Sequence, residues 1–68
     1  MPSTAIRHVD YEAARRVLTV TFVTGRRYVY TEVPRQVFEA FVTAPSKGTF
    51  FNAEIRDAYV YEELERLR

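Results

Sequence analysis

The sequence predicts an α+β domain, a three-stranded antiparallel β-meander followed by two short helices packed on one face. Three features predict it: apolar and polar residues alternate in the first half, a glycine can close a tight hairpin, and two apolar stripes recur at helical spacing in the second half. The chain is predicted to form one domain, residues 1–68, whose core draws on five tyrosines and five phenylalanines.

The first predicted strand lies near the N-terminus. Its apolar residues do not all fall on the same face of a regular strand. Ile6 falls on one side of a regular strand, whereas Val9 falls on the other. A β-bulge near Arg7 or His8 would return both apolar side chains to the same face.

The next two strands are predicted to form a hairpin whose register depends on Gly25. A three-residue loop ending at Gly25 needs a left-handed backbone only at that glycine, and it gives a type I turn with a bulge. In that register Tyr28 lies opposite Val20. Tyr30 lies opposite Leu18, so the large side chains of both strands share one face.

Two helices are expected to cover this face. Pro34 suits the first position of the first helix, and Pro45 ends it. Ser46 can cap the second helix through its hydroxyl. The tail, residues 60–68, is predicted to be a weak helix or a frayed end.

Composition excludes several classes of function. Ten Lys+Arg against nine Asp+Glu give a net charge of +1, which is not the strongly basic signature of many nucleic-acid-binding domains. No apolar run resembles a secretion signal or a membrane helix, so we expect a cytoplasmic protein without a membrane partner. The oligomeric state stays open.

Catalytic and cofactor sites find little support in the sequence. The absence of cysteine and the single histidine argue against a metal site, and no phosphate-binding loop motif is present, so no cofactor is expected. His8 and Asp10 would share a strand face and could form an oriented base, but a triad would need Ser46 brought close by folding. We therefore predict that the protein is not an enzyme.

The order of several short motifs resembles the KTSC domain, a bacterial family named for its occurrence at the C-terminus of some lysyl-tRNA synthetases and also found as a small stand-alone protein. The resemblance covers nearly the whole chain. It rests on a Tyr-x-Tyr element, a Val-Pro element and later Ser-x-Gly and Phe-Asn-x-x-Ile-Arg elements, which match Tyr28, Tyr30, Val33, Pro34, Ser46, Gly48, Phe51, Asn52, Ile55 and Arg56. Val60 departs from the proline expected there. Attachment to a tRNA-handling enzyme implies RNA binding by association.

The start of the second predicted helix is one candidate site. Free N–H groups at a helix start attract anions, Gly48 would allow a phosphate close approach, and Lys47 would add a mobile charge. The alternative is structural, with Ser46 only capping the helix and Gly48 only permitting close passage of the preceding helix.

Asn52 and Arg56, one helical turn apart, form a second candidate. Asn52 would either bind backbone groups in the loop before the helix or contact an RNA base edge. Arg56 would either grip a phosphate or cover aromatic residues with its stem.

The remaining candidates lie around the hairpin. Tyr28 and Tyr30 would stack on bases if their sheet face were open, but the predicted register places them in the core. Arg26, Arg27 and Arg35 would form a secondary basic rim.

Together these features predict a non-catalytic module that binds RNA, either tRNA or ribosomal RNA. The predicted RNA or anion contacts are Ser46, Lys47, Gly48, Asn52 and Arg56. The alternative is a protein–protein interaction module that docks a partner through its helices or an edge strand.

Overall fold

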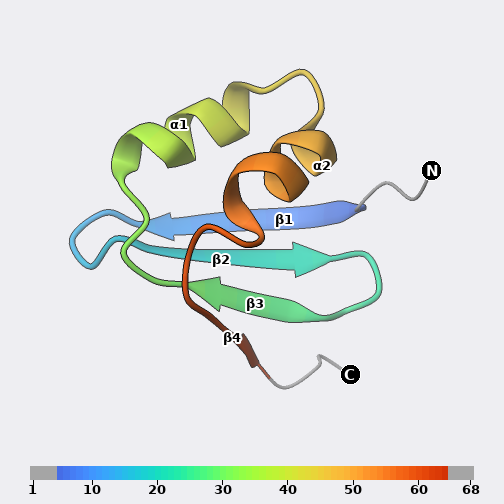
Figure 1. The fold of residues 1–68 in the computed structure, drawn as a ribbon. Coiled ribbons are helices and arrows are strands. Elements are labelled where there is room, and N and C mark those ends of the chain that lie inside the picture. Colours follow the sequence, from blue (N-terminus) through green and yellow to red (C-terminus); the bar gives the residue numbers. More distant parts are fainter. Residues whose placement is uncertain (1–4, 65–68) are drawn as a thin grey trace.

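The protein folds into an antiparallel sheet with helices on one face, seen in a computed structural model that describes residues 5–64 (Figure 1). The four strands, in their order across the sheet, are β1 (Ile6–Glu12), β2 (Val17–Phe22), β3 (Arg27–Tyr30) and β4 (Tyr61–Leu64). The helical layer comprises α1 (Arg35–Thr43), α2 (Lys47–Phe50) and η1 (Phe51–Ile55), a π-helical turn that continues α2. The predicted α+β class is confirmed, with a fourth strand added at the end.

The predicted bulge in β1 is present. Ile6 pairs with Phe22 and His8 pairs with Thr21, so the register shifts by one residue between them. As a result Ile6 packs against the same core as Val9. His8 is exposed on the other face of the sheet, which the helices do not cover.

The hairpin between β2 and β3 has the predicted register. Gly25 adopts a φ of 93°, a left-handed conformation that a side chain would disfavour. Its N–H donates to the Phe22 carbonyl at 2.9 Å, which closes the turn. Tyr28 and Tyr30 then lie opposite Val20 and Leu18, as expected.

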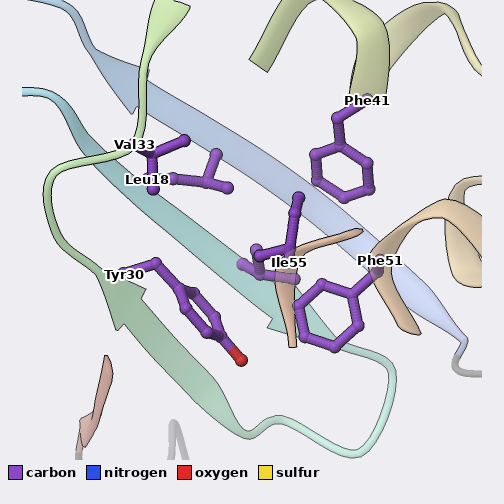
Figure 2. Close-up of a cluster of buried hydrophobic side chains, with 7 residues drawn as sticks. Leu18, Tyr30, Val33, Phe41, Phe51 and Ile55 are labelled. Carbon is purple, nitrogen blue, oxygen red and sulfur yellow. The ribbon is translucent and has the colours of Figure 1, made fainter. Parts of the chain in front are cut away.

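The core lies between the sheet and the helical layer (Figure 2). Its buried members come from β2, β3, the segment after β3, α1 and η1, and they are Leu18, Val20, Tyr30, Val33, Phe41, Phe51 and Ile55. Each buried aliphatic or aromatic side chain of this kind contributes about 1.5–3 kcal/mol relative to exposure. The tyrosine prediction therefore holds for Tyr30, which is 2% exposed.

A tyrosine also ties the first strand to the first helix. Tyr11 stacks on Phe38 with ring centroids 4.6 Å apart. Its hydroxyl donates to the Val33 carbonyl at 2.7 Å, so this half-buried phenol has a partner for its polar end.

The prediction for the tail is wrong where the structure describes it. Residues 61–64 form strand β4 rather than a weak helix, and residues 65–68 lie outside the described part of the chain. The free edge of β3 supplies the reason, because a new strand satisfies its unpaired backbone groups. The Thr31 N–H donates to the Val60 carbonyl at 3.0 Å, so the chain enters β4 although Val60 is not proline.

Candidate functional site

A cleft of about 550 Å³ opens where the β2–β3 hairpin, β4 and the end of η1 meet. We call it the tyrosine cleft and define it by its aromatic and polar lining residues, which are Phe22, Thr24, Arg26, Tyr28, Tyr30, Phe51, Asn52, Arg56, Asp57 and Tyr61. Its volume lies within the roughly 300–1,000 Å³ range of small-molecule sites. It therefore has room for one small planar group rather than an extended surface.

Three tyrosine rings form the cleft wall next to β3 and β4. Tyr61 lies with its ring centroid 5.4 Å from both Tyr28 and Tyr30, tilted by 39° and 33°. Tyr28 and Tyr30 are 6.5 Å apart and nearly parallel. The first two tyrosines thus serve the fold and the cleft together, whereas the sequence presented these roles as alternatives.

Burial keeps the Tyr30 hydroxyl protonated. The pKa of Tyr30 is raised to about 12, mainly by desolvation and then by nearby Tyr61 and Tyr28, while the Arg56 charge acts in the opposite direction. At neutral pH the Tyr30 side chain is a neutral phenol, whose hydroxyl can donate a hydrogen bond.

The π-helical turn places Asn52 and Arg56 in the cleft. The Arg56 N–H donates to the Phe51 carbonyl at 2.9 Å, a bond across five residues. Phe51 and Ile55 point into the core, and the residue after each of them lines the cleft. Turns of this kind are rare and occur frequently at functional sites.

Arg26 enters the cleft from the hairpin side. Its guanidinium lies 3.9 Å from the Glu63 carboxylate of β4, with both side chains about half exposed. Hydrogen bonding to Tyr28, followed by the charge of Glu63, raises the pKa of Arg26. An exposed pair at this distance contributes little to stability, so Arg26 can exchange Glu63 for another anion at small cost.

The predicted helix-start residues do not line this cleft. Ser46 caps α2 by accepting the Thr49 N–H at 3.2 Å, and its hydroxyl donates to the Thr49 hydroxyl at 3.0 Å. Lys47 is exposed and Gly48 is half-buried. The structure thus gives Ser46 its structural role and separates this group from Asn52 and Arg56.

The predicted basic rim is divided in the same way. Arg26 joins the cleft, but Arg27 lies on the opposite face of the sheet, where it pairs with Thr21 and its Nε atom is buried. Arg35 forms an exposed ion pair with Glu39 at 3.3 Å on α1. Only the first of the three arginines therefore meets the other candidate residues.

The features considered for catalysis are separated by the sheet. His8 and Asp10 are exposed on the outer face, and Ser46 belongs to the helical layer on the other face. Within residues 5–64 we find no group of three or more His, Cys, Asp or Glu side chains placed to hold a metal ion. The helices in that part of the chain are all too short or too polar to cross a membrane.

Comparison with known proteins identifies the family. The KTSC domain model matches residues 2–59. The chain belongs to the KTSC domain family. Its fold resembles the crystal structure of a KTSC domain protein from Yersinia pestis, with a TM-score of 0.87, 28% identity, and coverage of 96% of this chain and 92% of that one.

Relatives carry the KTSC segment in two contexts. It is 39% identical over 59 residues to a lysine–tRNA ligase of Trichormus variabilis, which covers 87% of this chain and 10% of the ligase. It is 35% identical over 57 residues to a protein of Tsukamurella paurometabola, which covers 84% of this chain and 85% of that protein. The chain thus spans about a tenth of the length of the ligase relatives it matches.

Tyr61 and Asp57 line the cleft but are not among the candidate residues that the sequence predicts. Tyr61 was hidden because the tail was interpreted as a weak helix, and the KTSC match ends at residue 59, before β4. The available signal was the unpaired edge that a three-stranded meander leaves at β3, which favours a further strand after the helices.

Proposed function

We propose that this KTSC domain is a small non-catalytic module that binds RNA through the tyrosine cleft. One observation carries the proposal: Asn52 from η1, Arg56 directly after η1 and Arg26 from the hairpin meet beside the rings of Tyr28 and Tyr30. Arginines contact phosphate, while amide and aromatic groups contact bases. The occurrence of the same segment in lysine–tRNA ligases supports a role near tRNA.

The charge balance in the cleft favours an anionic ligand with modest affinity. Arg26 and Arg56 are the basic lining residues and Asp57 is the acidic one, which gives the lining a net single positive charge, and Glu63 pairs with Arg26 from just outside the lining. Two phosphate contacts release few counterions, and each contributes a slope of about −0.7 to the salt dependence of single-strand binding. Lys47 would add at most a peripheral contact from outside the cleft.

Titration of labelled tRNA at low and physiological salt tests the proposal. We expect the logarithm of the binding constant to fall with the logarithm of the salt concentration, with a slope of about −1.4 for two phosphate contacts. Arg56→Ala and Arg26→Ala should each remove about one phosphate contact and so reduce the magnitude of this slope by about 0.7. Lys47→Ala should change the slope less. Arg15→Ala is the charge-matched control, because Arg15 is exposed beside Glu12 and does not line the cleft.

Absence of RNA binding would favour the alternative function, which is interaction with a protein partner. If labelled tRNA does not bind even at low salt, the RNA proposal is wrong. A protein partner held through apolar surface would then remain, and its binding would depend little on salt.

A further inference from the structure

The strand β4 adds an aromatic surface to the cleft that the family match does not include. Tyr61 is 52% exposed although its ring contacts both Tyr28 and Tyr30. Part of the ring therefore packs on the two neighbouring tyrosines, while the rest faces solvent at the cleft. Offset and tilted contacts of this kind fix the orientation of an aromatic ring.

We propose that Tyr61 is the stacking residue for one unpaired nucleotide of RNA, whose phosphate binds Arg26 or Arg56. This inference rests on the proposed function and specifies its ligand. A base stacked on an aromatic side chain contributes about 1–3 kcal/mol and needs no particular sequence. Tyr30 also lines the cleft, and in this proposal its hydroxyl donates to a polar edge of the base.

The size of the cleft favours a single strand over a duplex. About 550 Å³ accommodates one nucleotide-sized group, whereas paired bases in a helix are stacked on their neighbours and cannot enter a pocket. A duplex would reach only the exposed arginines at the rim. Arg26 and Arg56 can therefore attract the phosphates of either a duplex or a single strand. Only the unpaired base of a single strand can contact Tyr61.

Glu63 fits the same arrangement. It lies on β4 two residues after Tyr61, and its carboxylate is 3.9 Å from the Arg26 guanidinium. A phosphate that reaches Arg26 must compete with this carboxylate. Glu63→Gln should therefore strengthen RNA binding, while a role for β4 in structure alone predicts no gain.

Fluorescence anisotropy with a labelled short oligouridine and its duplex with oligoadenosine tests the inference. We expect the single strand to bind more tightly than the duplex. Tyr61→Leu should weaken single-strand binding by about five- to one-hundred-fold, the range for loss of one stacked base. Tyr61→Phe keeps the ring and should bind nearly as well as the natural chain.

A second measurement keeps the test valid if Tyr61→Leu disturbs the fold. Adding uridine or adenosine monophosphate to the natural protein should shift the Tyr61 ring resonances in the NMR spectrum, because a stacked base changes their local magnetic field. Resonances of Tyr11, which lies in the β1–α1 contact outside the cleft, serve as the internal control.

The outcomes separate this inference from the proposed function. If Arg56→Ala weakens RNA binding while Tyr61→Leu folds and binds normally, the RNA proposal stands and the stacking inference is overturned. Equal affinity for duplex and single strand would also overturn it. If no RNA binds under any condition, both are overturned.

Discussion

Tyr30 shows how one residue serves the fold and the candidate site. Its ring is buried in the core, packing edge-on against Phe51 at 5.6 Å, and the same residue lines the cleft. The same burial that stabilises the ring disfavours the phenolate, which is why its pKa rises to about 12.

The raised pKa of Tyr30 predicts a specific loss of stability at high pH. The unfolded chain loses the Tyr30 proton near its ordinary value of 10.0, whereas the folded protein keeps it to about 12. Deprotonation therefore favours the unfolded state, so the contribution is complete below pH 10.0 and is lost as pH rises toward about 12. Thermal unfolding across this range should show the decline.

Tyr30→Phe is the matched variant for this measurement, because it removes the ionisable group and keeps the ring. Its melting temperature should fall less steeply between neutral and strongly alkaline pH than that of the natural chain. Tyrosinate absorbance should also lose its latest-titrating component. If the melting temperature of the variant falls as steeply at alkaline pH as that of the natural chain, an ionisable group other than Tyr30 causes the decline.

The hairpin is the element that the sequence predicted in most detail. One glycine determined its loop length, the loop length determined the register, and the register determined which face carries Tyr28 and Tyr30. These steps are local, so they could be followed without knowing the rest of the fold. The bulge in β1 was equally accessible from the change of face between Ile6 and Val9.

Gly25→Ala tests this local control. At a φ of 93° a Cβ atom is unfavourable, so we expect a loss of about 1 kcal/mol or more in the free energy of unfolding. Gly25→Asn should cost less, because asparagine tolerates left-handed backbone better than alanine. Denaturant unfolding of both variants gives the comparison, and an alanine variant as stable as the natural chain would contradict the role assigned to Gly25.

The π-helical turn and β4 could not be predicted with the same method. A π-helical turn holds one more residue than an α-helical turn. It places both Phe51 and Ile55 in the core, and these contacts are visible only in the folded structure. Strand β4 depends on a free edge formed by β3, about thirty residues earlier in the sequence. Both features arise from tertiary structure, which local sequence patterns do not report.

At the scale of the whole molecule, the candidate site was predicted in part. Asn52, Arg56 and Arg26 were selected from their residue types and positions, and the structure brings them together. The sequence groups Lys47 with Asn52 and Arg56, but Lys47 precedes the turn that reaches the cleft. Tyr61 required knowledge of β4.

Removal of residues 61–68 tests how β4 contributes to the whole protein. Within residues 5–64, all seven buried core residues precede Tyr61, so we expect the shortened chain to fold with lower stability. It should also self-associate more, because the β3 edge becomes available for pairing. Circular dichroism and size-exclusion chromatography measure both effects.

The full-length Tyr61→Leu variant is the control for this truncation, since it loses the ring but retains the strand. It should remain as monodisperse as the natural chain. Self-association of that variant to the same extent would show that the ring, rather than edge pairing, prevents contact between molecules.

The β1 bulge leaves Asp10 exposed on the sheet face away from the helices and the cleft. Since the natural chain contains no cysteine, Asp10→Cys would introduce its sole thiol. A fluorophore or surface linker coupled there would project from the rear of the molecule. The protein can thus be immobilised in a single orientation with its ligand-facing side open to solution.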